Sequence, residues 1–555
     1  MAAHQRGAAR IPPVPDTEPA TDGQPTPPDD GRPADLEIGA FSDHAPWLVD
    51  PDAMSWRRAV PAMRQVVRRS LPELTRPQRV PPGLRVVRVA GHLGAAVGGW
   101  ALADRRKDQS ASRSGLSRRL RRAAEHLGPT YIKLGQIISS GEGLFPEELV
   151  TEFKKCRDQV TPETFASVRE VVETDLGRPL DAVFSSFERT PLAAASIAQV
   201  HAATLSTGEP VVVKVQRPRV RTLVHQDLKV MAWMAPFLVG RIPVAALANP
   251  PALVDLFAET ITEELDFRLE AENMLDVAAM FSALGATAYV IPRPHPDLVT
   301  ARVLVMERLD GFAFDDVVGM KDAGLDTEEI VRTGMVGFLE GCMFHGIFHG
   351  DLHGGNLFVL PDGRTALLDF GITGRLPEPR RQAFLRLLVG ASMNDLTTQM
   401  AALRDMGALP ADTDLAAVIK DLGLDRPAVD PTTLSPEELT AEIQRVVKAL
   451  LGYGARIPKE LMLFVKNMVF LDGAIATLAP DLDLFAEIAK MSTHFATIHG
   501  ARIARDVGMD LSSWELDLTG MKASFGVDPE QTNQLTYREL QDRRELIRQR
   551  MQKRK

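Results

Sequence analysis

The sequence FHGDLHGGNLFV, Phe348 to Val359, followed by LLDFG, Leu367 to Gly371, decides how the whole chain is interpreted. Asp351 and Asn356 lie close together in the first stretch, and Asp369 opens the Asp-Phe-Gly tripeptide in the second. Phosphoryl transfer needs a group that orients the attacking nucleophile, and hard oxygen ligands for Mg²⁺. We therefore expect Asp351 to lie beside the acceptor oxygen, and Asn356 and Asp369 to bind the metal.

The order and spacing of these residues follow the protein-kinase pattern His-x-Asp-(x)4-Asn…Asp-Phe-Gly. His349 stands where it would brace the catalytic loop, and Gly371 would let the backbone bend sharply after Asp369. A tripeptide alone recurs by chance, but the complete set, flanked by apolar strands, is specific. The alternative, an ordinary turn rich in aspartate and glycine, explains the spacing poorly.

A lysine stands upstream in a strand-like run. Lys214 lies inside VVVKV, which follows Thr207-Gly208 and predicts a strand after a hairpin turn. Lysine is rarely buried unless it has a partner or a ligand. In kinases a strand lysine holds the nucleotide phosphates, so we expect Lys214 to do so with a helix glutamate as its partner.

An alanine-rich segment ends at Val200, before that strand. AAASIAQV aligns with the kinase Gly-x-Gly-x-x-Gly-x-Val loop, with alanine in the glycine positions. Alanine keeps the loop small but gives up easy access to positive φ, so we expect a stiffer phosphate loop. An alanine run alone more often begins a helix, but its spacing to Lys214 favours the loop. The residues expected to line the nucleotide are Ala193, Ala194, Ala195, Ser196, Ala198 and Val200.

The segment MERL, Met306 to Leu309, follows a strand predicted over Val299 to Met306. Kinases place their hinge here, so we expect the backbone of Glu307 and Leu309 to contact the adenine edge. The alternative is that these are only core residues. Further expected elements are a strand–turn–strand over Leu357 to Leu368 with its turn at Pro361-Asp362-Gly363, and helices over Val254 to Met280 and Glu328 to Phe344.

Composition is that of a soluble globular protein, with 45% hydrophobic and 25% charged residues. The net charge of −9 argues against a nucleic-acid-binding surface. With only 2 cysteines, a disulfide framework or cysteine-built zinc site is not expected, and a cytoplasmic setting fits best. We predict no signal peptide and no transmembrane helix; Val86 to Ala103 and Val230 to Leu247 come closest.

Three further motifs narrow the interpretation: YIKLGQ (Tyr131 to Gln136), PLAAASIAQVH (Pro191 to His201) and EELDF (Glu263 to Phe267). With them the chain resembles the UbiB/AarF family of atypical kinases over roughly Leu116 to Leu376. Ala198 departs from the family, which usually has glycine before Gln-Val-His. The resemblance implies an α+β, two-lobed protein-kinase-like fold with helical extensions at both ends.

The resemblance also implies how the extension meets the site. Lys133 and Gln136 share one face of a helix that folds over the nucleotide cleft, where Lys133 meets Glu264 and Asp266. Glu264 is the first candidate partner for Lys214, and Glu270 is the second. A helix in this position would cover the place where a peptide substrate docks.

We divide the chain accordingly. The expected segments are a disordered tail at 1–40, a helical extension with the Lys-x-Gly-Gln motif at 41–180, an N-lobe at 181–310, a helical C-lobe at 311–480 and a C-terminal helical extension at 481–555. The basic end, Arg543 to Lys555, is first a solvated helix and alternatively a contact for anionic lipid.

The expected activity is Mg-ATP binding with transfer of the γ-phosphoryl group to water, a small molecule or a lipid, in isoprenoid quinone or lipid metabolism. ATP or ADP, and a lipophilic small molecule, are the expected ligands. Peripheral contact with the inner face of the membrane is an extension of this prediction. A true protein kinase and a nucleotide-switched scaffold of a membrane biosynthetic complex are the alternatives. Protein partners and the phosphoryl acceptor stay open.

Overall fold

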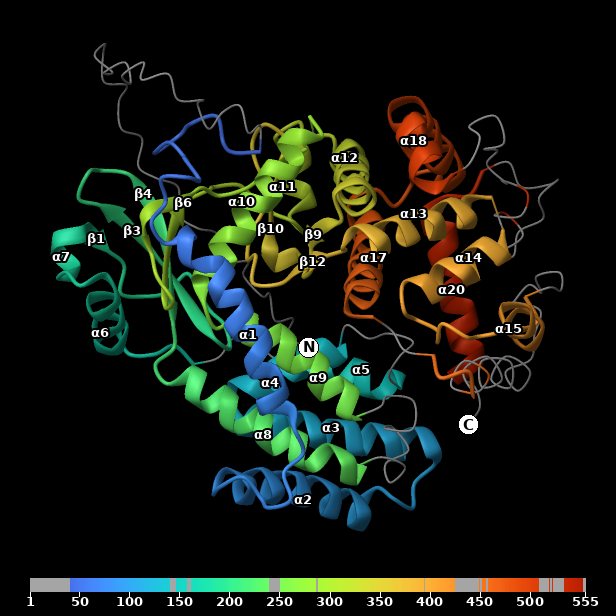
Figure 1. The fold of residues 1–555 in the computed structure, drawn as a ribbon, viewed down its shortest axis with the longest axis horizontal. Coiled ribbons are helices and arrows are strands. Elements are labelled where there is room, and N and C mark those ends of the chain that lie inside the picture. Colours follow the sequence, from blue (N-terminus) through green and yellow to red (C-terminus); the bar gives the residue numbers. More distant parts are fainter. Residues whose placement is uncertain are drawn as a thin grey trace, which may run out of the picture.

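The chain has a mixed α+β architecture, in which an antiparallel sheet lies at the left of Figure 1 and the C-terminal helices lie at the right. This is the fold class predicted from the sequence. The computed structural model describes residues 40–139, 146–156, 161–238, 250–285, 288–393, 395–424, 449, 452–455, 458–508, 519, 522 and 534–552. The predicted disordered tail lies outside the described residues except for Ala40.

Helices that precede the sheet form a layer with two later helices, at the bottom of Figure 1. Asp108 caps α3 by accepting a hydrogen bond from the Ala111 N–H, and Gly128 at φ +104° separates α3 from α4. Buried apolar side chains of α4, α8 and α9 share one cluster. The elements are η2 (Arg57–Ala59), α1 (Val60–Thr75), α2 (Arg85–Ala103), α3 (Gln109–Leu127), α4 (Pro129–Ser139), α5 (Glu147–Phe153), α8 (Val220–Leu238) and α9 (Pro250–Glu263).

The main sheet has the strand order β1-β3-β4-β7-β6, with β2 beside β3, and its pairs are antiparallel. Alternation along β4 buries Val211, Val213 and Val215 against α6, and puts Lys214 on the opposite face. The predicted hairpin turn before β4 is confirmed, with Gly208 at φ +107°. The elements are α6 (Phe165–Leu176), α7 (Leu180–Val183), β1 (Phe184–Phe187), β2 (Ala193–Ala194), β3 (Ala198–Leu205), β4 (Pro210–Gln216), β6 (Pro294–Val299) and β7 (Val303–Glu307).

One predicted strand and one predicted helix are each divided in the structure. The strand expected over Val299 to Met306 is interrupted by a turn in which the Thr300 N–H donates to the Val303 carbonyl (2.8 Å). The helix expected over Val254 to Met280 is α9 followed by α10 (Phe267–Ala283). It divides because Asp266, in extended conformation, caps α10.

Short strands lie at or near both ends of the segments Phe348 to Val359 and Leu367 to Gly371. The predicted hairpin around Pro361-Asp362-Gly363 is confirmed as β10 and β11, and β9 pairs with β12 so that His349 lies opposite Thr373. The elements are β5 (Tyr289–Val290), β8 (Phe312–Ala313), α11 (Val317–Asp322), α12 (Thr327–Glu340), the π-helical turn η4 (Gly341–His345), β9 (Ile347–His349), the 3-10 turn η5 (Gly354–Asn356), β10 (Leu357–Val359), β11 (Thr365–Leu367) and β12 (Thr373–Arg375).

Beyond Pro377 the described residues are mostly helical, as predicted. The basic helix α20 is attached to the rest of the chain, because Tyr537 and Leu540 are buried and Arg544 pairs with Asp472 (2.6 Å) on α17. The elements are α13 (Glu378–Ser392), α14 (Leu396–Asp405), α15 (Leu415–Leu422), α17 (Lys459–Leu478), α18 (Leu484–Val507) and α20 (Tyr537–Gln552).

Two of the described helices, α2 and α17, are long and apolar enough to cross a membrane by length and composition alone. No transmembrane helix was predicted from the sequence. Helix α17 is a core helix whose side chains Leu463, Asn467 and Leu471 are buried. Cys156 and Cys342 are both buried.

Candidate functional site

Lys214 is the centre of the site. Its ammonium group donates to Glu270 on α10 (2.7 Å) and to Asp369 (3.0 Å), and it lies over the ring of Phe267. The first candidate partner, Glu264, is therefore wrong, and the second candidate, Glu270, is the partner. The reason is the break between α9 and α10, which leaves Glu264 outside both helices and puts Glu270 in the first turn of α10 beneath β4.

His349 and Asp369 hold the two loop segments together. The Nε2 atom of His349 lies 3.0 Å from the Leu368 carbonyl and 2.9 Å from the Asp369 carbonyl, and its Nδ1 accepts from the Asp351 N–H (3.1 Å). The predicted bracing role of His349 is confirmed. The predicted bend at Gly371 is wrong in position, because Asp369 itself takes the left-handed conformation (φ +58°).

Gly371 is needed for space. A Cβ there would lie 3.2 Å from the side chains of Asp369 and Glu264, so a larger residue would push against the two acids. The Gly371 N–H donates to Asp369 Oδ1 (3.2 Å), which fixes the carboxylate in place.

The predicted metal ligands Asn356 and Asp369 lie on adjacent segments, since the Leu368 N–H donates to the Asn356 carbonyl (2.9 Å). The Asn356 amide donates to the Asp351 carbonyl (3.0 Å), which orients this side chain. The Asp369 side chain is 47% exposed although Lys214 beside it is buried. Carboxylate and amide oxygens are ligand types that suit Mg²⁺.

Helix α4 reaches the site from the N-terminal extension. Lys133 pairs with Glu264 (3.1 Å) and approaches Asp351 Oδ2 (3.9 Å). Gly135 allows α4 to pack closely, since a Cβ there would lie 2.6 Å from the Phe153 ring. The expectation that Asp266 also holds Lys133 is wrong, because its carboxylate caps α10 and binds the Arg268 guanidinium (2.8 Å). Gln136 lies on the same helix as Lys133.

Charges at the site stabilise one another. Burial alone would raise the pKa of Asp351, but Lys466 and Lys133 lower it far below its usual range. Desolvation would likewise raise the pKa of Asp369, and Lys214 and Lys133 lower it to about 2. Both carboxylates are therefore ionised at neutral pH, which suits a cation-binding site.

The alanine-rich segment is a hairpin, not a helix start. Ala193 and Ala194 form β2, the Ala195 N–H donates to the Ala198 carbonyl (2.8 Å), and Val200 lies opposite Lys214. Ser196 is buried. The guanidinium of Arg217 donates to the Ala195 carbonyl (2.9 Å) and so holds the loop in place.

The predicted hinge carries a buried ion pair. Glu307 accepts from Arg293 (3.3 Å), which is fully buried, and its N–H donates to the Arg293 carbonyl (2.9 Å). The Glu307 side chain is therefore structural. Met306 is buried, and Leu309 packs against the cluster around Val290.

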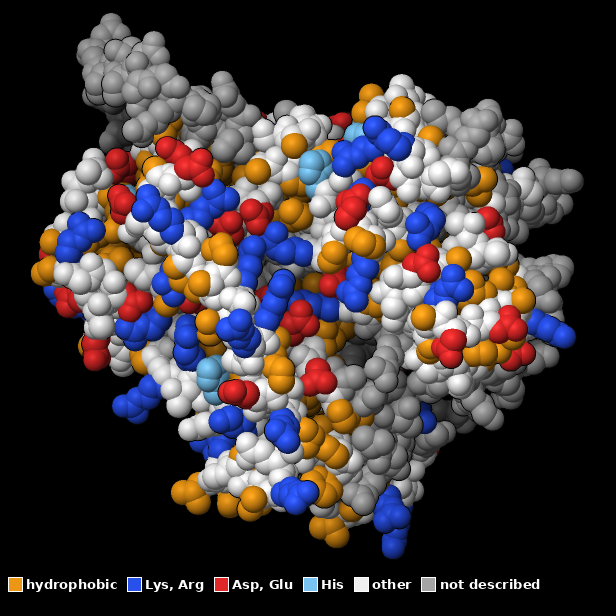
Figure 2. Space-filling view, viewed as in Figure 1, with side chains coloured by type: hydrophobic (Ala, Val, Ile, Leu, Met, Phe, Trp, Pro, Cys, Tyr) orange, Lys and Arg blue, Asp and Glu red, His pale blue; other side chains and the backbone are white. Residues whose placement is uncertain are grey.

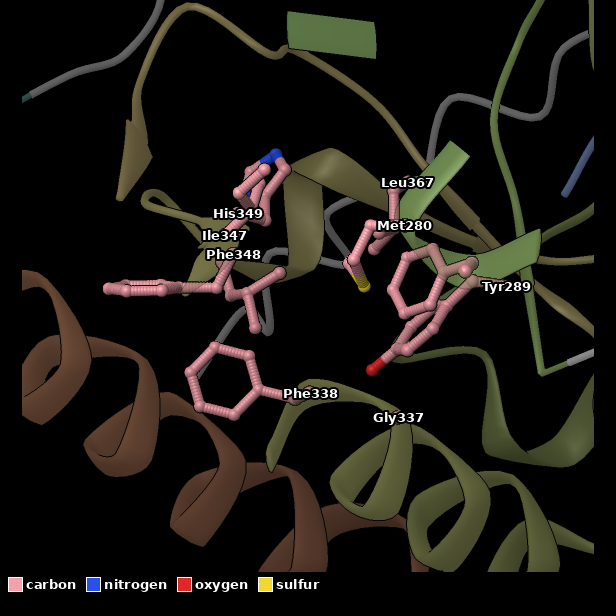
Figure 3. Close-up of a pocket in the computed structure, with 10 residues that line it drawn as sticks. Met280, Tyr289, Gly337, Phe338, Ile347, Phe348, His349 and Leu367 are labelled. Carbon is pink, nitrogen blue, oxygen red and sulfur yellow. The ribbon is translucent and has the colours of Figure 1, made fainter. Parts of the chain in front are cut away.

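An apolar pocket lies behind the catalytic loop (Figure 3). Phe338, Phe348 and Tyr289 line it, and the Tyr289 hydroxyl donates to the Gly334 carbonyl (2.5 Å). It does not include Lys214 or Asp369. The pocket therefore belongs to the apolar packing around His349, which is one of its lining residues.

Comparisons with known proteins identify the family of the chain. Residues 155–403 match the family model described as the ABC1 atypical kinase-like domain. The probable protein kinase UbiB of Aliivibrio fischeri is 30% identical over 376 residues, which are 67% of this chain and 69% of that protein. The chain belongs to the ABC1/UbiB/AarF family of atypical kinase-like proteins. Its α+β fold therefore contains a kinase-like domain.

Other family members are similar over the same share of this chain. The uncharacterized protein Rv0647c of Mycobacterium tuberculosis is 38% identical over 379 residues, 67% of this chain and 76% of that protein. The chloroplastic protein ACTIVITY OF BC1 COMPLEX KINASE 1 of Arabidopsis thaliana is 32% identical over 374 residues, 67% of this chain and 54% of that protein. A solved complex of Rv3197 with erythromycin from Mycobacterium tuberculosis covers 62% of this chain and 91% of that chain, at 23% identity and a TM-score of 0.37.

Two residues beyond the family model contact the site and were missed from the sequence. Lys466 binds Asp351 Oδ1, and Asn467 accepts from the Leu352 N–H (3.0 Å). Both lie on α17. Their signal was present as the polar pair Lys-Asn inside the apolar run Leu461 to Leu471.

Glu270 gives the site a pH-dependent stability. Burial raises its pKa from 4.5 to about 7, although Lys214 opposes the rise. When the folded pKa of an acid exceeds the unfolded one, stability falls as pH rises between the two values. Urea titrations should therefore show that the wild type loses about 1–3 kcal/mol of stability relative to Glu270→Gln between pH 5 and pH 8. The exposed Glu170→Gln is the control, and a difference independent of pH would contradict the prediction.

Proposed function

We propose that this family member binds Mg-ATP and transfers the γ-phosphoryl group to water or to a small lipophilic acceptor. The observation that carries the proposal is the contact of Lys214 with both Glu270 and Asp369, next to Asp351 and Asn356. Burying a lysine together with two acids costs desolvation free energy. A cluster of this kind is expected where the charges serve to bind a ligand. Strand lysine, helix glutamate and loop aspartate are the groups that kinase-like proteins use on phosphates and metal.

Each side chain has a distinct task in this proposal. Lys214 holds phosphate oxygens, and Glu270 keeps its ammonium in place. Asn356 and Asp369 would hold Mg²⁺, which neutralises charge on the phosphates. Asp351 orients the attacking oxygen; because its pKa is depressed, it acts by orientation and charge more than by accepting a proton. The β2–β3 hairpin covers the nucleotide, and the backbone at Glu307 and Leu309 contacts adenine.

Helix α4 favours a small acceptor over a protein substrate. Lys133 contacts Glu264 and approaches Asp351, so the helix stands over the side of the site where a peptide would have to enter. Water or a compact acceptor needs less room. This observation supports an ATPase or a small-molecule phosphotransferase. We propose that such an activity serves quinone or lipid metabolism.

Purified full-length protein tests the proposal directly. We expect calorimetric binding of ATP that requires Mg²⁺, and release of inorganic phosphate or a phosphorylated lipophilic acceptor. Radiolabelled ATP with a quinone-precursor mimic, and separately with a generic protein acceptor, distinguishes small-molecule from protein transfer. A protein that neither binds nor hydrolyses Mg-ATP under any of these conditions would rule the proposal out.

A nucleotide-controlled switch is the second candidate, because both oxygens of Asp351 face lysines, Lys466 and Lys133. In this alternative, Lys133 on α4 occupies the side of Asp351 that an acceptor would need. In that case ATP or ADP binds tightly with negligible turnover until α4 moves. Turnover that begins only on addition of lipid or a partner would favour the switch over a constitutive ATPase.

We also propose that α2 makes peripheral contact with an anionic membrane. Only 17% of the apolar stretch of this helix is buried, and Leu84, Val87 and Leu102 are exposed. Figure 2 shows apolar side chains gathered at the bottom of the molecule, where Figure 1 places α2, with basic side chains near them. Arg105 and Arg106 follow directly. Apolar burial combined with attraction of arginine to anionic lipid is how interfacial helices bind.

Liposome sedimentation checks this contact. We expect binding to vesicles containing anionic phospholipid, weaker binding to neutral vesicles, and a loss of about tenfold or more in Val87→Glu/Leu102→Glu, because each introduces a charge into the apolar face. Val66→Glu, an equally exposed apolar site on α1, is the matched control. Equal binding of the double variant and the wild type would contradict the prediction.

A further inference from the structure

Helix α17 contacts the catalytic loop from outside the matched kinase-like domain, which ends at residue 403. Two consecutive residues make the contact. The Lys466 ammonium donates to Asp351 Oδ1, and the side chains of both residues are largely buried. Asn467 accepts from the Leu352 N–H (3.0 Å) and donates to the His349 carbonyl. Asn467 is fully buried, so its bonds to the loop are not shared with water.

The catalytic loop has no lysine or arginine of its own between His349 and Asn356. The cations beside Asp351 are instead Lys133 on α4 and Lys466 on α17, which approach different oxygens of the carboxylate. Kinase-type chemistry depends on the orientation of this carboxylate, because it positions the attacking oxygen. A carboxylate tied through one oxygen presents the other in a fixed direction.

We propose that Lys466 is a positioning residue for Asp351, and that the site is complete only when α17 is docked on the catalytic loop. Lys466 fixes Oδ1, which leaves Oδ2 on the side that Lys133 approaches and where the acceptor would enter. Asn467 fixes the backbone on both sides of Asp351, through His349 and Leu352. The inference rests on the proposed function, because positioning has a kinetic effect only if Asp351 orients a nucleophile.

The simpler reading is that Lys466 only attaches α17 to the domain. A substitution of Lys459 distinguishes a positioning role from simple attachment of α17. Lys459 lies on the same helix two turns earlier, its side chain is as deeply buried, and it pairs with Glu259 (3.1 Å) and Glu263 (3.3 Å) on α9. Lys459→Met therefore removes a docking ion pair from α17 and leaves the contact with Asp351 in place.

Steady-state kinetics on the full chain tests the positioning role. We expect Lys466→Met to lower kcat by about 10–100-fold, with KM for Mg-ATP within about threefold, because the phosphate and metal groups lie on other elements. Lys466→Arg should recover most of kcat, since a guanidinium also holds a carboxylate. Lys459→Met should stay within about twofold of the wild type. An equal loss in Lys459→Met, or a change in KM alone, would overturn the inference.

Hydrogen exchange supplies a readout that does not depend on turnover. The Leu352 amide is protected through Asn467, so peptides covering residues 349–356 should exchange faster in Lys466→Met than in the wild type or Lys459→Met. If the wild type shows no turnover, the proposed function fails while this comparison still decides whether Lys466 positions the loop. Unchanged exchange in Lys466→Met, with the variant folded, would overturn the inference.

Discussion

Asp369→Asn is expected to lower Mg-dependent nucleotide turnover by about 10²–10³-fold, because it removes the charge of the proposed metal ligand and one of the two acids that hold Lys214. The variant is well suited to the test. Asp369 has φ +58°, a conformation that asparagine adopts as readily as aspartate, so the backbone need not change. Lys214 keeps Glu270 as its partner and stays buried in place.

The measurement is the initial rate of phosphate release over a range of Mg²⁺ concentrations, with thermal unfolding to show that the variant is folded. Asp362→Asn is the matched control, since Asp362 is an acid of the β10–β11 turn that pairs with Arg364 away from Lys214. Its turnover should be within about twofold of the wild type, as for most surface substitutions. Wild-type rates and wild-type Mg²⁺ dependence in Asp369→Asn would exclude Asp369 as a metal ligand.

Arg293→Met is expected to destabilise the protein by about 3–5 kcal/mol, because it leaves the Glu307 carboxylate buried without its cation. Arg293 is fully buried and donates to Glu307 (3.3 Å), to the Ser42 hydroxyl (2.7 Å) and to the Ser42 carbonyl (2.6 Å). It also lies over the ring of Phe41. The Arg293 guanidinium therefore joins the segment before α1 to the hinge strand, where the Ser42 hydroxyl also donates to Glu307.

The size of this effect should depend on pH. Burial raises the pKa of Glu307 although Ser42 and Arg293 oppose the rise, and loss of Arg293 raises it further. For an acid with a raised folded pKa, stability is lost as pH increases, so Arg293→Met should cost more at pH 8 than at pH 5.

Urea denaturation of three variants checks the explanation. Arg293→Met/Glu307→Gln should recover part of the loss, because the unpaired charge is gone. Arg308→Met, which removes a pair with the half-exposed Asp310 (3.3 Å), should cost about 1 kcal/mol or less. A loss below about 1 kcal/mol in Arg293→Met at pH 8 would mean that the buried pair is not a source of stability.

Much of the fold could be predicted because the sequence signals are local. The segment that forms β4 is a short valine-rich run, and the turns at Gly208 and Gly363 need positive φ. The two divided elements were harder to predict. Asp266 ends the expected helix by capping α10, but it is one of several acidic residues between Val254 and Met280, so its role as a cap is a weak signal in the sequence.

The site was predicted in part, for the same reason. Lys214, Asp351, Asn356 and Asp369 belong to short motifs whose spacing is fixed by the loops that hold them, and the structure brings them together. The partner of Lys214 was predicted wrongly. Glu264 and Glu270 are equally acidic in sequence, and only the start of α10 decides which of them faces β4.

What the sequence determined by itself is the family, the kinase-like fold class and the motif residues, because each depends on residue type and short spacing. The tertiary structure alone decided the contacts between distant segments. It chose Glu270 as the partner of Lys214, placed Lys466 on Asp351 across 115 residues, and tied Arg293 to Ser42 across 251. Such contacts depend on how helices pack against the domain, and neither local periodicity nor motif spacing carries that information.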